Sequence, residues 1–480
     1  MNPRATAPLE RESPIWGCVV LAGATLIALA SAHSFAGSWN DGSRLATAEA
    51  LVDYHTWAID QSIFVHPNGV APGGPAPYTD FALEQGGTLD KLLINGHYYS
   101  DLSPTPSLWL AAVYAGLEFC TGWTARTHAD AYCYLLTLAT SGLGYIVAVW
   151  SIHRLGRPLR LPHPWRLALT ASFALTTVAA AYTRHVNNHI CLLGVVAALM
   201  VEMAWLAQGT AATRGRMLRL GLLAGLSYTI DIGTGPILLG GATVWLVYRC
   251  RRLAPLTVFA AAAGLWVAPH HGLNYAIGGT FGPANAAPAY LDWPGSPFNV
   301  HTMTGLWVHQ APGSCLLYAF DLLVGKQGFL GHNLALWLAI PACWTLCRRP
   351  VADRPECLLA ACWCVGVWLL YSVASTNHSG VCCSIRWFVP LLAPAFYILA
   401  VWLRDCSPAH RRDFCILSAW GLALGVLMWW AGPWTAHRIP GFWAILTSAL
   451  ASWVVSAYLR WREPPVEVKP AAWPVQRRAA

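Results

Sequence analysis

A carboxylate lies where the first apolar run of the chain ends, in the stretch NDGSRLATAEAL at 40–51. This residue, Asp41, could act as a general base, because a carboxylate at the membrane edge can take a proton from an attacking hydroxyl group. It could equally cap the helix that follows, since Asp and Asn are favoured at helix N-caps. Arg44 and Glu49 are interpreted as a solvated helix face. The stretch therefore supports a catalytic and a structural hypothesis for Asp41.

Three further stretches place polar side chains near the membrane: DKLLINGHYYSDLSP at 90–104, TRHVNNH at 183–189 and NHSGVCCSIRWF at 377–388. Ionisable groups at membrane depth are costly and are usually retained for a function, which draws attention to Arg386 and Asp231. The candidate substrate-binding residues are Lys91, His97, Tyr98, Tyr99, Asp101, Arg184, Asn188, His189 and Arg386.

The same residues also have structural interpretations. The tyrosines and His97 would suit an aromatic belt at the membrane interface, and Asn188 and His189 would satisfy a buried turn. Arg386 would snorkel toward a backbone carbonyl, and Asp231 would bond the ends of a broken helix. Both interpretations stay open on the sequence alone.

The composition predicts a membrane protein that crosses the bilayer many times. Of the 480 residues, 56% are apolar and only 11% are charged, which is too few charges for a water-soluble surface. The 26 Trp suit interfacial belts on many spans. A net charge of +8 is then read as a bias between the two sides of the membrane and not as a sign of nucleic-acid binding.

Apolar runs of about 20 residues mark the candidate spans. They lie near 14–36, 130–152, 167–183, 189–208, 253–269, 333–347, 356–374, 387–403, 414–431 and 441–459. The stretch 220–248 is long for one span and breaks at IDIGTGP, 230–236, so it predicts two short helices that meet at Asp231. A cleaved signal peptide at 14–36 is the alternative, and it would also leave Asp41 outside.

The apolar run at 104–120 is assigned to the membrane surface by the distribution of Lys and Arg. If it does not cross, 23 Lys and Arg lie on the cytoplasmic side and 7 lie outside. This gives an all-α polytopic fold of about twelve spans, with juxtamembrane helices between the first and second. One such helix is expected at 43–59, with Glu49 and Asp53 on its polar face.

The predicted organisation has four parts. They are a cytoplasmic N-terminus at 1–13, a transmembrane module at 14–400 with external loops at 37–129 and 270–331, a C-terminal transmembrane hairpin at 401–460 and a cytoplasmic tail at 461–480. Most of the 15 cysteines fall in predicted spans and are read as free thiols.

Taken in order, these motifs resemble the GT-C membrane glycosyltransferases, in particular the protein O-mannosyltransferase and lipid A aminoarabinose transferase group. The marks are NDGSRLATAEALVDYHTWAID, NGHYYSDLSPTPSLWLAAVY, TRHVNNH, GLLAGLSYTID at 221–231 and NHSGVCCSIRWF, which together span roughly 14–400. The resemblance implies a GT-C-like fold and transfer of a hexose or pentose from a polyprenyl-phosphate donor to a hydroxyl group, with inversion. Asp41 would be its base. The acceptor would be a glycan, a lipid or a protein.

The resemblance also implies a multi-pass protein of the cell (inner) membrane, with both termini cytoplasmic and the active site on the external or periplasmic face. Three positions depart from the pattern of the group: Gly42 replaces a second acid, Leu102 a lysine and His189 an acid. Arg386, Arg184 and Lys91 are the available phosphate ligands, and Arg386 is favoured because a guanidinium suits a phosphate.

No cofactor is expected, although a divalent metal held by Asp41 and His189 is an alternative. Two other functions stay open. A catalytically inactive protein that binds lipid-linked sugars would share the motifs and their departures, and a transporter or flippase would share the broken helix pair.

Overall fold

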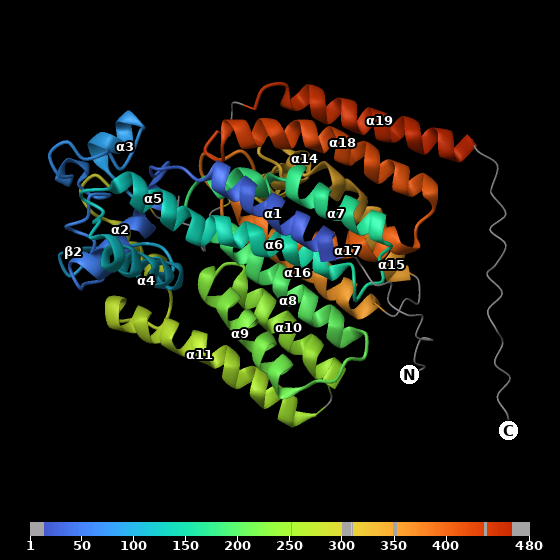
Figure 1. Ribbon diagram of the computed structural model, residues 1–480, viewed down its shortest axis with the longest axis horizontal. Coiled ribbons are helices and arrows are strands. Elements are labelled where there is room, and N and C mark those ends of the chain that lie inside the picture. Colours follow the sequence, from blue (N-terminus) through green and yellow to red (C-terminus); the bar gives the residue numbers. More distant parts are fainter. Residues whose placement is uncertain are drawn as a thin grey trace.

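The computed structural model describes residues 14–250, 252–299, 309, 311–348, 353–435 and 439–462. The predicted cytoplasmic segment 1–13 lies outside the described residues, as does the predicted tail beyond Arg462. The chain forms a bundle of long helices with a layer of shorter elements at one end of it (Figure 1).

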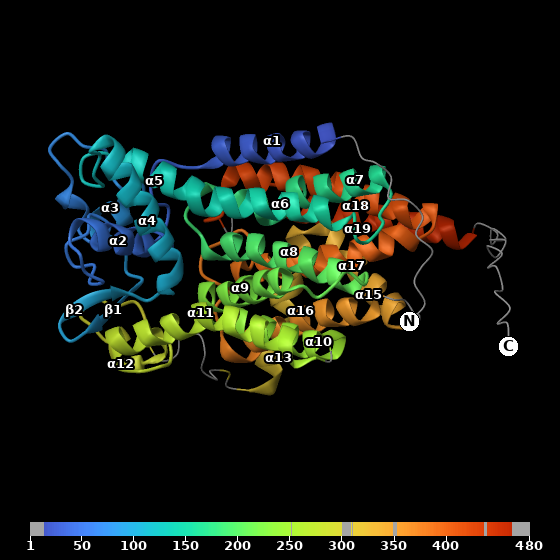
Figure 2. The same cartoon turned by 60° about the horizontal axis from the view of Figure 1, so that its bottom comes forward.

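The bundle consists of apolar helices that run side by side (Figure 2). They are α1 (Pro14–Ser31), α6 (Leu143–Leu155), α7 (His163–Leu175), α8 (Asn188–Ala207), α9 (Arg214–Ile230), α10 (Gly235–Cys250), α11 (Leu253–Gly278), α15 (Ala339–Arg348), α16 (Arg354–Ala374), α17 (Leu392–Asp405), α18 (Pro408–Ala431) and α19 (Phe442–Arg462). Helix α13 (Pro312–Val324) runs in another direction, because the segment Pro312–His332 is bent by 111° from Leu334–Arg348. Seven helices of the described part are long and apolar enough to cross a membrane, and a bent pair, Pro312–His332 with Leu334–Arg348, would add an eighth. The figure of about twelve spans remains a prediction.

The predicted break at Asp231 is confirmed. Helix α9 ends at Ile230 and α10 begins at Gly235. The Asp231 carboxylate accepts hydrogen bonds from the backbone N–H groups of Gly233 and Thr234, at 2.9 and 3.1 Å. These bonds satisfy amides at the start of α10 that have no partner within the helix.

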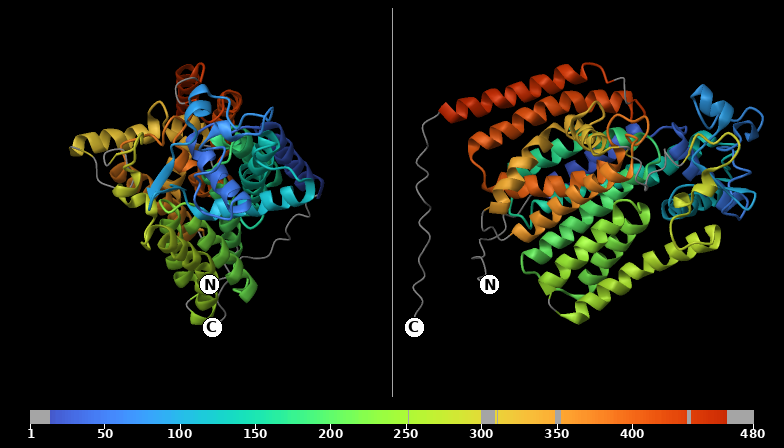
Figure 3. Two further views of the ribbon diagram at one scale, coloured as in Figure 1. Left: turned by 90° about the vertical axis from the view of Figure 1, so that its left-hand side faces the viewer. Right: turned by 180° about the vertical axis from the view of Figure 1, so that it is seen from behind.

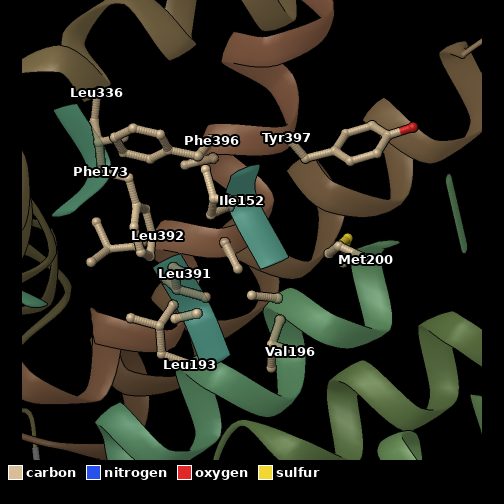
Figure 4. Packing of buried hydrophobic residues seen from close by; sticks show 14 of the residues in the cluster. Ile152, Phe173, Leu193, Val196, Met200, Leu336, Leu391, Leu392, Phe396 and Tyr397 are labelled. Atoms are coloured by element: carbon tan, nitrogen blue, oxygen red, sulfur yellow. The ribbon is translucent and has the colours of Figure 1, made fainter. Parts of the chain in front are cut away.

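The core of the bundle surrounds α8. Figure 4 shows Leu193, Val196 and Met200 of α8 facing the side chains of 391–397, which are the end of a 3-10 turn (Arg386–Leu391) and the start of α17. All of these α8 residues are buried. The packing fixes α8 against the chain that carries Arg386.

Two glycines bring α6 and α8 into close contact. A Cβ added at Gly144 would lie 2.6 Å from the backbone oxygen of Ile190, and one at Gly194 would lie 2.5 Å from the backbone oxygen of Gly144. Small residues at such positions let two helix backbones meet inside a membrane. The contact holds the N-terminal residues of α8, Asn188 and His189, in place.

Shorter elements form the layer at the end of the bundle, which is called the external layer after the side of the membrane that the sequence predicts for it (Figure 3). They are α2 (Trp39–Asp53), α3 (Phe81–Gly86), β1 (Lys91–Ile94), β2 (His97–Ser100), α4 (Pro104–Thr121), the start of α5 (Ala129–Thr137) and the short α12 (Pro288–Leu291). Helix α4 packs against α2 through Leu110 and Tyr114. This placement agrees with the assignment of 104–120 to the membrane surface.

The strands β1 and β2 form an antiparallel hairpin that was not expected from the sequence. Ile94 pairs with His97 across a two-residue turn, in which Asn95 and Gly96 have φ values of 53° and 84°. Asn-Gly is the typical sequence of such a turn, because both positions need a positive φ. This dipeptide is the signal that would have predicted the hairpin.

The helix expected at 43–59 is present but shorter and earlier, and its polar face was assigned wrongly. Ser38 caps its start and Tyr54 ends it, followed by His55 at a φ of 55°. Arg44 and Glu49 are buried and not solvated. Glu49 is buried because the loop that follows the helix folds back over it. In this loop Ser62 Oγ and the Ile63 N–H donate to the Glu49 carboxylate at 2.5 and 3.0 Å.

Candidate functional site

A cavity of about 480 Å³ lies between the external layer and the ends of the bundle helices. Helix α2 lines it with Asn40, Arg44 and Thr47, which lie on one helix face because they are four and three residues apart. The other polar and aromatic residues that line it include Trp57, Asp90, Tyr99, Asp101, Asn188, His189, Asp231, His270, Asn274, Tyr371, Arg386 and Trp387. The cavity therefore joins the external layer, the start of α8, the α9–α10 break and the 3-10 turn before α17.

Two guanidinium groups meet at this cavity. Arg44 is buried, and its Nη1 donates to the backbone oxygen and the side-chain oxygen of Asn40 at 3.0 and 2.5 Å. Burial, followed by the positive charge of Arg386, lowers the pKa of Arg44 to about 10. Like charges held together out of water favour a bound anion, which would restore the balance.

The guanidinium group of Arg386 has a hydrogen-bond donor that no described residue uses. Its backbone N–H donates to Ser379 Oγ at 3.0 Å. Its Nε is buried and has no hydrogen-bond partner within the described residues. The guanidinium carbon lies 5.9 Å from the ring centre of Trp434, which comes from the segment between α18 and α19. A planar group with unused donors is suited to bind a phosphate.

Two carboxyl groups of the external layer face the two arginines. Burial raises the pKa of Asp90, while the charges of Arg386 and Arg44 act in the opposite direction. Burial and then the charge of Asp90 raise the pKa of Asp101 well above its usual range. One oxygen of Asp101, Oδ1, is buried without a partner in the described part of the chain. The pair can therefore hold one proton and accept another, as coupled carboxyls do.

His189 and Asp231 form a third polar group in the cavity. The imidazole Nδ1 of His189 lies 3.0 Å from Oδ2 of Asp231, and both side chains are buried. The other oxygen of Asp231, Oδ1, accepts the hydrogen bonds from the start of α10, so the two oxygens have different partners. The structural interpretation of Asp231 is therefore correct, but it is not the whole role of the residue.

Aromatic rings complete the lining. Trp387 stacks on Tyr371, with ring centres 4.2 Å apart and planes 7° from parallel. Trp57 and Tyr99 line the cavity from the external layer. Amphipathic rings of this kind offer an apolar surface together with polar edges, which suits a sugar.

Five of the ten predicted site residues line this cavity: Tyr99, Asp101, Asn188, His189 and Arg386. They come from three stretches that are far apart in the sequence. The grouping of the hairpin end, the start of α8 and the 3-10 turn before α17 therefore agrees with the sequence analysis.

Asp41 does not line the cavity, and its role as a base stays a prediction. Its carboxylate accepts hydrogen bonds from the Gly37 N–H at 2.6 Å and from Ser38 Oγ, and Oδ2 lies 3.4 Å from His185 Nδ1. One residue step rotates a helical side chain by about 100°, so when Asn40 faces the cavity Asp41 faces elsewhere. Burial raises the pKa of Asp41 to about 6.

The other four predicted residues also lie outside the cavity lining. Arg184 donates through Nε to His33 Nε2 at 2.6 Å and through Nη1 to the carbonyls of 429–430. Lys91 Nζ lies over the Tyr98 ring, 4.4 Å from its centre. His97 is mostly exposed, with Nδ1 3.2 Å from an oxygen of Asp60. These residues hold parts of the fold together.

Sequence reasoning missed Arg44, Asp90, Asn40, Thr47 and Trp57. The signal for the α2 residues was the spacing of Asn40, Arg44 and Thr47, which defines a single helix face. A search of the described residues finds no group of three or more His, Cys, Asp and Glu side chains able to hold a metal ion.

No family profile matches the chain, and no curated protein matches its sequence. The apo form of ArnT from Cupriavidus metallidurans matches with a TM-score of 0.51 and 14% identity, over 92% of this chain and 75% of that chain. ArnT bound to undecaprenyl phosphate gives 0.49 and 14%, over 93% and 76%.

A third match is the archaeal oligosaccharyltransferase AglB from Archaeoglobus fulgidus, in complex with an inhibitory peptide and a dolichol-phosphate. Its TM-score is 0.45 at 13% identity, over 93% of this chain and 56% of that chain. At such identities the apo ArnT structure shows a likeness of fold alone. The chain is thus an all-α polytopic membrane protein with a GT-C-like fold.

Proposed function

We propose that this protein is a membrane glycosyltransferase that moves a sugar from a polyprenyl-phosphate donor to an acceptor hydroxyl on the outer face of the membrane. The single observation that carries the proposal is the cavity in which Arg44 and Arg386 face Asp90 and Asp101. The GT-C-like fold supports it. ArnT, which shares this fold, is also found with undecaprenyl phosphate bound.

The two arginines bind the phosphate of the donor. Arg386 offers unused donors, and Arg44 adds a second positive charge from α2. Charge on the leaving phosphate increases as its bond to the sugar breaks, and preorganised cations stabilise that charge. These arginines take the place of the lysine that is absent at Leu102.

The Asp90 and Asp101 pair accepts the proton of the acceptor hydroxyl. An inverting displacement needs one carboxylate beside the attacking oxygen. Burial raises the pKa of Asp90, which helps it to accept a proton, while the nearby arginines act in the opposite direction. Asp101 has an oxygen without a partner among the described residues. Trp57, Tyr99 and Trp387 would hold the sugar between them.

The sidedness is part of the proposal. The termini lie in the cytoplasm and the cavity opens toward the external or periplasmic side of the inner membrane, as the distribution of Lys and Arg predicts. The donor is a hexose or pentose on a polyprenyl phosphate, and the acceptor is a glycan, lipid or protein of the cell envelope.

The test is release of undecaprenyl phosphate from undecaprenyl-phosphate sugars by the purified, reconstituted protein, with envelope extract as acceptor. Asp101→Asn and Asp90→Asn are expected to lower the rate by about 100-fold or more, which is the usual effect of losing a general base. Arg386→Ala is expected to raise the KM for the donor about tenfold or more, because a hydrogen bond to a charged group is lost. Asp80→Asn, at an exposed helix cap, is the matched control.

Two results would contradict the proposal. Donor binding without turnover by the wild-type protein would support an inactive protein that binds lipid-linked sugars. Movement of the lipid-linked sugar across the bilayer, unchanged by the Asp101 and Asp90 substitutions, would support a flippase.

A further inference from the structure

We propose that His189, held by Asp231, binds the phosphate of the donor and gives it a proton as the sugar leaves. The inference rests on the proposed function, because it assigns a task to one side of the same cavity. It adds a proton donor to the two arginines and separates the two proton transfers of the reaction.

His189 and Asp231, called the dyad, lie within ion-pair distance of each other, although Nδ1 is not aligned for a hydrogen bond to the carboxylate. Asp231 Oδ2 lies 3.0 Å from Nδ1 of His189, and Asp231 is itself fixed by the backbone N–H groups of Gly233 and Thr234. A carboxylate this close to Nδ1 favours a proton on that nitrogen and opposes the loss of the imidazolium form. The other ring nitrogen, Nε2, is then the group that the imidazole can offer to a ligand in the cavity that His189 lines.

The position of the dyad assigns it to the phosphate and not to the acceptor. His189 lies in the first turn of α8, and Asp231 lies at the break between α9 and α10, so both belong to the membrane bundle. Asp90 and Asp101 belong to the external layer. A lipid-linked donor enters from the bundle side, whereas an acceptor arrives from outside. The N-terminus of α8, a helix of 20 residues, also favours an anion near His189.

The charge balance explains why a third group is useful. The donor phosphate is a diester with one negative charge, and the released polyprenyl phosphate is a monoester that can carry two. Arg44 and Arg386 supply fixed charges, but neither gives up a proton. An imidazolium can do so, and the approaching phosphate together with Asp231 places a negative group at each of its ring nitrogens.

The reaction then balances in one displacement. The acceptor oxygen forms a bond to the anomeric carbon, and its proton passes to the Asp90 and Asp101 pair. The bond between the anomeric carbon and the phosphate oxygen breaks, and its electron pair stays on that oxygen. The proton on Nε2 of His189 moves to the phosphate. Water later takes the proton from the carboxyl pair and returns one to the imidazole.

The sequence did not predict this arrangement, because the resemblance implies an acidic residue where His189 stands. The remaining charged and titratable groups around the cavity are Arg44, Asp90, Tyr99, Asp101, His270, Tyr371 and Arg386. Of the cavity residues, His189 is the one whose ring nitrogen lies within 4 Å of a carboxylate in the described ion pairs.

The test combines lipid binding with transfer, using the full-length protein in detergent. The probes are undecaprenyl phosphate and uncharged undecaprenol. In His189→Gln the amide still donates a hydrogen bond but cannot transfer a proton. We expect binding of undecaprenyl phosphate to stay within about threefold and single-turnover transfer to fall about 100-fold, as for loss of a general acid. His189→Ala should also weaken undecaprenyl phosphate binding about tenfold and leave undecaprenol binding unchanged.

Asp231→Asn keeps an oxygen for Gly233 and Thr234 and should show the same loss of transfer with the melting temperature retained. His271→Asn is the matched control, because His271 bonds Tyr228 and the carbonyl of Phe281 and does not line the cavity. Full transfer activity in His189→Gln would overturn the inference, and so would a loss of transfer activity in His271→Asn equal to that in His189→Gln. In both cases transfer by the wild-type protein would still support the proposed function. If the wild-type protein neither binds undecaprenyl phosphate nor transfers a sugar, the proposed function itself fails.

Discussion

At the scale of single residues, one helical step separates a cavity position from a structural one. Asn40 faces the cavity and Asp41 faces the backbone that precedes α2. Gly42 follows, and a side chain there would meet the hydroxyl of Tyr78, so the second acid of the resembling group has no room in this chain. The carboxylates of the cavity instead come from Asp90 and Asp101.

This placement predicts a structural effect for Asp41→Asn. The carboxylate accepts from the Gly37 N–H with one oxygen and from Ser38 Oγ–H with the other, whereas an amide has a single acceptor oxygen. One of these bonds is therefore lost, and we expect a loss of about 1–2 kcal/mol in unfolding free energy. Transfer by the folded protein should stay within about threefold of wild type. Thermal unfolding in detergent and the transfer assay measure the two effects. Abolished transfer with unchanged stability would instead restore Asp41 as the base.

Glu49 predicts a pH dependence of stability. Burial raises its pKa from 4.5 to about 8, so the folded state holds the proton more tightly than the unfolded state does. Its contribution to stability is present below pH 4.5 and is lost as pH rises toward 8, at up to about 1.4 kcal/mol per pH unit.

Glu49→Gln removes this loss, because the amide is neutral and can still pair with Ser62 and Ile63. The measurement is the melting temperature between pH 5 and 8, which should fall less steeply in the variant than in wild type. Glu84→Gln, in α3, is the control and should follow the wild-type slope. Equal slopes for wild type and Glu49→Gln would show that Glu49 keeps its charge when buried.

At the scale of elements, the site depends on the packing of α8 against α6. The helix contacts α6 through Gly144 and Gly194 and carries His189 at its N-terminus. The substitution Gly194→Val would place new atoms against the α6 backbone, and we expect it to cost about 1–3 kcal/mol of stability. Donor binding should weaken as well, because Asn188 and His189 would shift.

The control for this prediction is Gly264→Val in α11, where a Cβ would meet no heavy atom within 4 Å. Melting temperatures and binding of undecaprenyl phosphate are the measurements. If Gly194→Val behaves like Gly264→Val in both, the close contact of α6 and α8 does not position the site.

Several elements could be predicted from the sequence because a local signal determines them. The break at Asp231 follows from Gly and Pro in IDIGTGP, and the Arg386 stretch follows from a charge at the edge of an apolar run. The hairpin also has such a signal in Asn95-Gly96, because both residues tolerate the positive φ that its turn requires. The burial of Arg44 and Glu49 had none, because it depends on loops that fold back from elsewhere in the chain.

At the scale of the whole molecule, the proposed sidedness can be tested with the native cysteines. Cys120 is exposed at the end of α4 in the external layer, and Cys406 lies in the connection between α17 and α18. A membrane-impermeant maleimide should label Cys120 in intact cells and Cys406 only after permeabilisation, as read by mass spectrometry of the labelled peptides. The reverse pattern would place the cavity in the cytoplasm.

The cavity exists only in the assembled fold, since its arginines come from α2 and from the turn before α17, more than 300 residues apart. The most direct test of the account is a cryo-EM structure of the full chain with undecaprenyl phosphate. We predict density for the phosphate between the guanidinium groups of Arg44 and Arg386, within hydrogen-bond distance of both and of His189. Phosphate density at another site, with the two arginines unoccupied, would contradict the account.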